Sequence, residues 1–146
     1  MNKINVSNNF TLDEFIDPVS YANLMRGIAI AQYIRETTGQ PVTINNWANG
    51  GQYRESGYRR PDSKTGSPTS EHRLMNGWDF KIGTWSGQQM FTWAVQHAQP
   101  LYNLGARRFE DVSLTPTWFH IDGREHGQKA IRVIDLKHVV QTIFVK

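Results

Sequence analysis

The sequence predicts an α+β domain in which an antiparallel sheet is flanked by helices. Some segments have apolar residues at helical spacing and others have the alternation of strands, and the two kinds do not follow a regular βαβ rhythm. A length of 146 residues suits one domain over residues 1–146 with a single core. A hydrophobic content of 38% excludes disorder as the default state.

The first part of the chain predicts two helices. Thr11 is followed three residues later by Glu14, a capping-box pattern that opens a short helix. A longer helix is expected from Pro18 to Thr38, with Gly39 as its stop. Its apolar residues at helical spacing are Leu24, Ile28, Ala31 and Ile34. This longer helix is expected to be part of the core scaffold.

A strand over residues 41–45 precedes an unusually long connection. Residues 48–71 are rich in Gly, Ser, Arg and Pro, and loops of this length in compact domains tend to be functional or disordered. Three arginines in it are candidates for gripping a substrate carboxylate with two hydrogen bonds: Arg54, Arg59 and Arg60. At least one of them is expected to be solvated or to pair with Glu55 or Asp62.

The second half of the chain predicts one more helix and three strands. Residues 86–104 form an amphipathic series that Pro100 kinks or ends, and His97 is assigned to packing within it. Strands are expected near residues 107–112, 117–122 and 131–136. Of the remaining histidines, His126 either lines the cleft or binds nothing, and His138 is expected at the surface.

Three side chains have the chemistry of a catalytic metal site. His72, Asp79 and His120 provide two imidazoles and a carboxylate, the ligand types of a zinc ion with three protein ligands and a position open for water. The sequence contains no cysteine, so nitrogen and oxygen atoms must hold any such metal. These residues predict a metal hydrolase with Zn²⁺ as its cofactor.

The spacing of the first two candidates requires a turn. On a straight strand His72 and Asp79 would lie roughly 23 Å apart at about 3.3 Å per residue, too far to share one ion. Asn76-Gly77 tolerates positive φ and suits the reversal. Residues 78–82 then alternate like a strand, so Asp79 is expected to face away from its two aromatic neighbours.

The motif residues resemble those of the M15 family of zinc peptidases. The resemblance covers roughly residues 41–124. The M15 family includes D-Ala-D-Ala carboxypeptidase-like and phage endolysin-like peptidases of peptidoglycan. Its members share a fold with the Hedgehog signalling domain. The residues that carry the resemblance are Ser56-Gly57-Tyr58-Arg59, Ser70 with His72, Asp79-Phe80, and Trp118-Phe119-His120-Ile121-Asp122.

The resemblance implies a ligand set and a substrate cleft. It makes His72, Asp79 and His120 the zinc ligands of a Hedgehog/DD-peptidase-like fold, and it places Arg59 in the cleft. Arg54 and Ser70 are the other candidate substrate-binding residues. The chain also departs from the family, which usually has Gly and Ala where Met75 and Gly77 stand.

The general base is open between two carboxylates. Family members usually have Glu, Asp or His two or three residues before the last ligand, where this chain has Thr117 and Trp118. Asp122 shares a strand face with His120 about 6.6 Å away and is favoured by that geometry. Glu110 could arrive on a neighbouring strand. Asp122 could instead support a ligand or an arginine through a hydrogen bond.

Net charge and hydropathy indicate which partners and which cellular location to expect. The net charge of +3 suits an acidic wall peptide as well as a solvated face, and no motif or dense basic patch indicates nucleic acid. Residues 1–20 contain acidic residues and no long apolar run, so neither a signal peptide nor a membrane segment is expected. We therefore expect the host cytoplasm before lysis, or association with a virion if a phage encodes the chain.

Taken together, the residues and the resemblance predict a zinc metallopeptidase. Its expected substrate is an amide bond in stem or cross-link peptides of bacterial peptidoglycan, cut as a carboxypeptidase or an endopeptidase. The alternative is a non-catalytic virion or cell-wall-binding structural protein that retains the peptidase fold. The departure before His120 supports that alternative.

Overall fold

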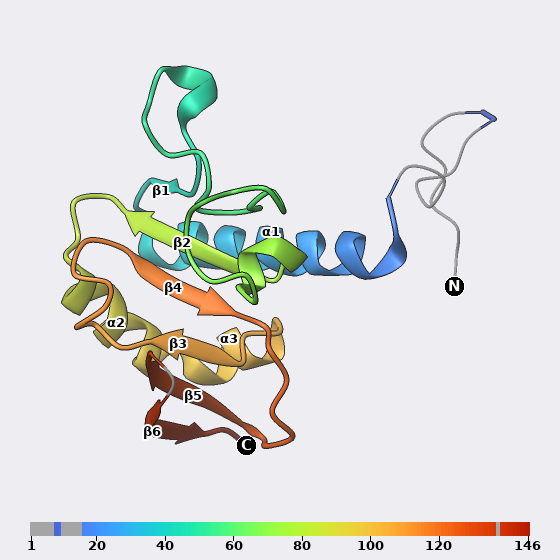
Figure 1. Cartoon of the computed structure of the whole chain (residues 1–146). Coiled ribbons are helices and arrows are strands. Elements are labelled where there is room, and N and C mark those ends of the chain that lie inside the picture. The colour runs from blue at the N-terminus through green and yellow to red at the C-terminus, as the bar shows by residue number, and fades with distance from the viewer. Residues whose placement is uncertain (1–7, 10–15, 137) are drawn as a thin grey trace.

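A six-stranded sheet organises the part of the chain that the computed structural model describes, which is residues 8–9, 16–136 and 138–146. The strand order is β1-β2-β4-β3-β5-β6 (Figure 1). The strands are β1 (Val42–Thr43), β2 (Gly77–Ile82), β3 (Arg108–Glu110), β4 (Phe119–Asp122), β5 (Ala130–Asp135) and β6 (His138–Phe144). Together with the helices described below, this sheet confirms the α+β class.

The sheet is mixed, so the expectation of an antiparallel sheet is wrong at one pair. β3 and β5 run parallel, with Arg108 beside Arg132, whereas the other neighbouring strands are antiparallel. The reason is the path of the chain after β4. β4 returns along one side of β3, and residues 123–129 then carry the chain to the other side of β3, where β5 begins.

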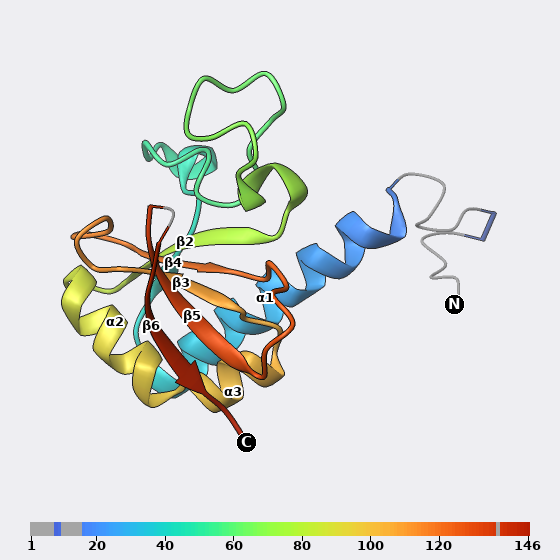
Figure 2. The ribbon, with the colours of Figure 1, turned by 60° about the horizontal axis from the view of Figure 1, so that its bottom comes forward.

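The helices pack on one face of the sheet, and the long connection between β1 and β2 lies on the other side (Figures 1 and 2). α1 (Pro18–Thr38) begins at Asp17, whose side chain accepts a hydrogen bond from the Ser20 N–H at 2.8 Å. It ends at Gly39, where φ is 65°. Both expected bounds of this helix are confirmed, and the capping pattern at Thr11 lies outside the described residues.

The predicted helix over residues 86–104 is divided in two. α2 (Gly87–Gln96) carries a capping box from Ser86, and α3 (Ala98–Asn103) follows after a break at His97. The break therefore precedes Pro100, which lies in the first turn of α3, where the missing N–H has no helical partner to lose. The His97 ring stacks on Trp93 with centroids 4.2 Å apart, which fits its assignment to packing.

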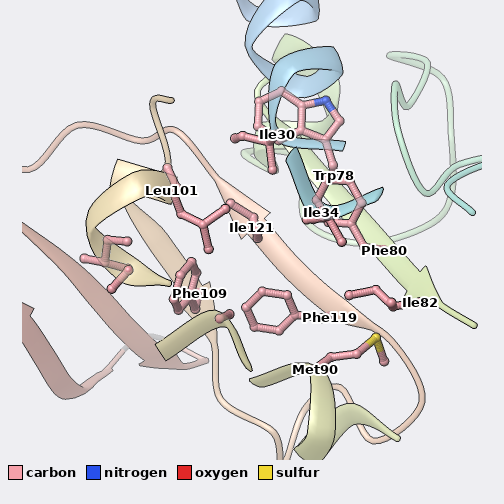
Figure 3. Close-up of a cluster of buried hydrophobic side chains, with 14 of the residues drawn as sticks. Ile30, Ile34, Trp78, Phe80, Ile82, Met90, Leu101, Phe109, Phe119 and Ile121 are labelled. Carbon is pink, nitrogen blue, oxygen red and sulfur yellow. The ribbon is translucent and has the colours of Figure 1, made fainter. Parts of the chain in front are cut away.

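The core lies between the sheet and the helices (Figure 3). Phe80, Phe109 and Phe119 from three strands are fully buried there, in one cluster with Ile30 and Ile34 of α1. The helical series predicted for α1 is partly wrong, because Ile28 is 51% exposed. The buried stripe runs through Ile30 instead, one turn before Ile34.

β6 was not predicted, because its sequence does not have the pattern of a half-buried strand. It is one of the two edge strands of the sheet, and most of its residues are exposed. Val139 and Val140 are neighbours that are 48% and 53% exposed, so no alternation marks a buried face. Among the described helices, none is long and apolar enough to cross a membrane.

Candidate metal centre

Asp79 and His120 meet because β2 and β4 pair directly. The register places Asp79 opposite His120, on the sheet face that points away from the helices. Their neighbours Phe80 and Phe119 point into the core, so the alternation expected for β2 is confirmed. The pairing of two strands that are distant in sequence thus supplies two of the three predicted ligands.

His72 lies on a short helix that precedes β2 in the chain. The 3₁₀ helix η3 (Glu71–Leu74) is capped by the Ser70 side chain and ends at Met75, where φ is 56°. The expected turn at Asn76-Gly77 is therefore shifted, since Met75 takes the left-handed conformation and Gly77 already lies in β2.

Gly77 has a different role, which is to allow close approach. A Cβ atom there would lie 3.0 Å from Glu71 Cβ and 3.2 Å from His120 Cε1. Any larger residue at this position would push η3 away from β4. Gly77 thus lets the helix that carries His72 lie against the strand that carries His120.

The three ligand atoms converge within 4.8 Å of one another, so His72, Asp79 and His120 could hold a metal ion. His72 Nε2 lies 3.3 Å from Asp79 Oδ1, and His120 Nδ1 lies 2.8 Å from the same oxygen. Both imidazoles are buried. The predicted trio is therefore brought together as a cluster of suitable donors.

The second nitrogen of each imidazole is held by an oxygen atom. His72 Nδ1 donates to the Gly57 carbonyl at 2.7 Å, which leaves Nε2 directed at Asp79. His120 Nε2 lies 3.2 Å from Asp122 Oδ2, which leaves Nδ1 directed at Asp79. Such oxygen partners fix the tautomer and the ring orientation of metal-binding histidines.

The electrostatics of the site favour a positive charge between its carboxylates. Burial opposes protonation of His120, but hydrogen bonds to Asp122 and Asp79 outweigh burial and raise its pKa to about 10. Burial likewise opposes ionisation of Asp79, yet the hydrogen bonds from His120 and His72 hold the pKa of Asp79 well below its usual range. A metal cation would occupy the place where the metal-free site keeps a proton.

Asp122 is occupied by several donors. It is 1% exposed, and Arg108 donates to both of its oxygens, from Nε at 2.9 Å and from Nη2 at 2.7 Å. The backbone N–H of Arg124 donates to Oδ1 at 3.0 Å. With His120 on Oδ2 as well, the carboxylate has the surroundings of a group that orients a ligand.

Glu110 lies in the same row of the sheet as the ligands. β3 pairs with β4 through Phe109 opposite Ile121, so the next residue, Glu110, comes opposite His120. Its side chain lines the same cavity as His72, Asp79 and His120. No hydrogen bond or ion pair engages its carboxylate within the described residues.

The metal-ligand cluster opens into a cavity of about 740 Å³. Besides the three candidate ligands, its wall has acidic and basic side chains and an apolar end. The charged members are Arg59, Glu71, Arg108, Glu110, Asp122, Arg124 and Arg132, and the large apolar members are Trp118, Ile134, Leu136 and Val139.

Arg59 and Ser70 lie at this cavity, close to His72. The Arg59 backbone N–H donates to the His72 carbonyl at 3.0 Å, and the guanidinium is buried with Nη1 3.4 Å from Ser70 Oγ. Nη2 donates to the Glu55 carbonyl at 3.3 Å, and Nε is buried without a hydrogen-bond partner. The two candidates from the resemblance are thus neighbours of the first ligand.

The other two loop arginines do not line the cavity of the candidate ligands. Arg54 is placed over the Trp47 ring at 5.9 Å and lines a neighbouring cavity that also touches Asp79. Arg60 pairs with Asp62 at 3.0 Å and is exposed, which confirms that at least one loop arginine is paired in this way. His126 Nε2 donates to the Arg107 carbonyl at 3.1 Å, and His126 does not line the cavity. His138 is exposed.

A second ion pair, which the sequence did not predict, lies next to the candidate ligands. Glu71 is buried, with Oε1 2.5 Å from Arg124 Nε and Oε2 2.6 Å from Asn76 Nδ2. This pair ties η3 to the segment that follows β4. Only the proximity of Glu71 to His72 and of Arg124 to Asp122 in the sequence could have indicated it.

Fold and site together define an α+β protein with a buried cluster of two histidines and one aspartate that could hold a metal ion. Comparisons with protein-family models, with curated proteins and with solved structures found no match. The resemblance to M15 peptidases therefore depends on the motif residues alone and stays a prediction.

Proposed function

We propose that this chain is a zinc-dependent peptidase of the M15 type that hydrolyses an amide bond in peptidoglycan stem or cross-link peptides. The observation that carries the proposal is the convergence of His72, Asp79 and His120 at one cavity. Their order and surrounding motifs supply the choice of peptidase and substrate. Phage origin and association with a virion stay predictions of the same resemblance.

The donors suit zinc in type. The cluster offers two nitrogens and one oxygen, a set found in catalytic zinc sites. Tetrahedral ligands at about 2.05 Å from the ion would be roughly 3.3 Å apart. His72 Nε2 lies 3.3 Å from Asp79 Oδ1, and His120 Nδ1 lies closer to that oxygen, at 2.8 Å. When bound, zinc would supply Lewis-acid activation of water and of the scissile carbonyl.

In this proposal Glu110 is the general base. Its carboxylate faces the cavity in the row of Asp79 and His120, and no side chain in the described part of the chain engages it, so it can accept a proton and return it to the leaving amine. Asp122, which the sequence favoured, has its oxygens occupied by Arg108 and His120. We therefore assign Asp122 to orienting His120.

Arg59 would hold the substrate beside the first ligand. Its guanidinium lies at the cavity wall, no carboxylate forms an ion pair with it among the described residues, and its Nε has no partner. A carboxylate or carbonyl of the peptide could accept from this group. Ser70, which contacts Arg59, would keep the guanidinium in place.

The test is hydrolysis of purified peptidoglycan. We expect wild-type protein loaded with zinc to release new amino termini, and a chelator or His120→Ala to abolish the release. Binding to peptidoglycan without release of amines in any zinc-loaded sample would contradict the peptidase. That outcome would favour the non-catalytic wall-binding or virion protein instead.

A further inference from the structure

We infer that Arg132 binds a free carboxylate of the substrate at a subsite two strands away from the metal ligands. The inference rests on the proposed function, because it assumes that a peptide lies in the cavity. It adds a substrate class, namely peptides with an acidic group several residues from the cleaved amide. Neither the motif residues nor the family resemblance includes Arg132.

The register places Arg132 on the open face of the sheet. β3 and β5 are parallel neighbours with Arg108 beside Arg132, so the two side chains share a face. Arg108 contacts Asp122 on that face, and Arg132 lines the same cavity as His120 and Asp79. A ligand extending from the metal ligands across β3 would therefore meet Arg132.

Arg132 differs in its partners from the two cavity arginines that form ion pairs. Arg108 pairs with Asp122, and Arg124 pairs with Glu71. The Arg132 guanidinium instead donates to Gln128 Oε1, from Nε and from Nη2, each at 3.1 Å. Among the described residues no carboxylate lies within ion-pair distance of it.

This contact resembles one side of a carboxylate pair. A single amide oxygen accepts from the two nitrogens that would otherwise form the parallel hydrogen bonds of an arginine-carboxylate pair. Gln128 is an exposed neutral side chain, so a substrate carboxylate could replace it without breaking an ion pair. The exchange would add a charge-assisted interaction in place of a neutral one.

The cavity wall beside Arg132 has apolar residues. Ile134 follows Arg132 on the same face of β5 and lies beside Glu110, and Val139 of β6 lies opposite Ile134. Leu136 lines the cavity as well. Such a wall suits the aliphatic part of an extended peptide.

The position of Arg132 predicts how far the bound carboxylate lies from the cleaved amide of the substrate. Two strand spacings of about 4.8 Å and a shift of two residues along the strand separate the His120 and Arg132 backbones by roughly 12 Å. An extended peptide covers about 3.3–3.6 Å per residue. The carboxylate is therefore expected about three residues from the cleaved amide.

The experiment compares the wild type with an Arg132 variant on substrates in which single carboxylates are amidated. The probes are the synthetic stem peptide L-Ala-γ-D-Glu-L-Lys-D-Ala-D-Ala and forms in which one carboxylate at a time is a carboxamide. We expect one amidation to lower kcat/KM of the wild type by about 10–100-fold, the range for one charge-assisted contact. Arg132→Gln should have a kcat/KM lower by the same factor on the unmodified peptide. That amidation should then cause no further change in its kcat/KM.

Matched controls separate charge from position. Arg35→Gln removes the same charge from an exposed site on α1 and should keep the full effect of amidation. Arg132→Lys should recover only part of the discrimination, because it keeps the charge without the two parallel hydrogen bonds. Zinc content and thermal unfolding of Arg132→Gln should equal those of the wild type.

The outcomes distinguish this inference from the proposed function. Equal amidation effects in wild type and Arg132→Gln would overturn the inference and leave the peptidase intact. If neither the wild type nor the variants hydrolyse the peptides or peptidoglycan, the proposed peptidase function is wrong. Calorimetric binding of the same peptides then tests whether Arg132 binds a carboxylate. A Kd that weakens at least about tenfold in Arg132→Gln for the acid form only would support it, and absent or equal binding would overturn it.

Discussion

At the scale of single residues, the candidate metal centre depends on how two carboxylates divide their roles. Asp122 is held by Arg108 and contacts His120, whereas Glu110 faces the cavity without such partners. Both residues have the same functional group and lie near His120 in the strand register, Glu110 opposite it and Asp122 two residues along the same strand. Their different surroundings are what assign one to support and the other to proton transfer.

Replacement of each carboxylate by its amide should separate these roles. We expect Glu110→Gln to keep zinc and stability but to lose about 10²–10⁴-fold in turnover, the usual contribution of a general base. Asp122→Asn should lower the free energy of unfolding by about 3–5 kcal/mol, because it leaves Arg108 without its buried partner. Peptide hydrolysis and urea denaturation measure the two effects, and an active Glu110→Gln would contradict the assignment.

Arg59→Lys tests the substrate contact beside His72. Lys keeps the charge but cannot reach Ser70 and the Glu55 carbonyl together with a fork of donors. We expect zinc content and fold to be kept and kcat/KM to fall by about tenfold or more. Unchanged kinetics on a defined muropeptide would mean that Arg59 is structural.

The stability of the metal-free protein should depend on the ionisation of His120. Its pKa is raised from 6.5 to about 10, so its contribution to stability is complete below pH 6.5 and is lost as pH rises through about 10. We expect the free energy of unfolding, measured by urea denaturation with a chelator present, to fall across that interval. His120→Asn should lack this component, and equal pH slopes in both proteins would contradict it.

At the scale of helices and strands, the sequence predicted the features that neighbouring residues determine, such as helix ends. α1 has its expected bounds because Asp17 and Gly39 cap it within a few residues of chain. The break at His97, the edge strand β6 and the parallel pairing of β3 with β5 were not predicted, because long-range packing decides them. The residue types and the family resemblance likewise indicated the three candidate ligands but not the partners of Asp122 and Glu71.

The packing of α1 on β2 gives a test at this scale. A Cβ atom at Gly27 would lie 2.3 Å from Trp78 Nε1, so Gly27→Ala forces the helix and the indole apart. We expect a loss of about 1–3 kcal/mol in stability, despite the better helix propensity of Ala. In a Trp78→Phe background the same change should cost less, and an equal cost in both backgrounds would contradict the contact.

At the scale of the whole molecule, the sheet separates two kinds of chemistry. One face packs against the helices through aromatic and aliphatic side chains (Figure 3). The other face presents Asp79, His120, Glu110, Arg108 and Arg132 to the cavity. Each strand contributes to both faces by alternation. The core therefore holds β2, β4, β3 and β5 in the register on which the site depends.

Metal content of purified protein tests the metal centre most directly. We expect elemental analysis to find one zinc per chain in the wild type and in His126→Ala, whose histidine lies outside the cavity. His72→Ala, Asp79→Ala and His120→Ala should each lose it, because three protein ligands are the usual set of a catalytic zinc site. Equal zinc in wild type and in folded His120→Ala protein would contradict the metal centre.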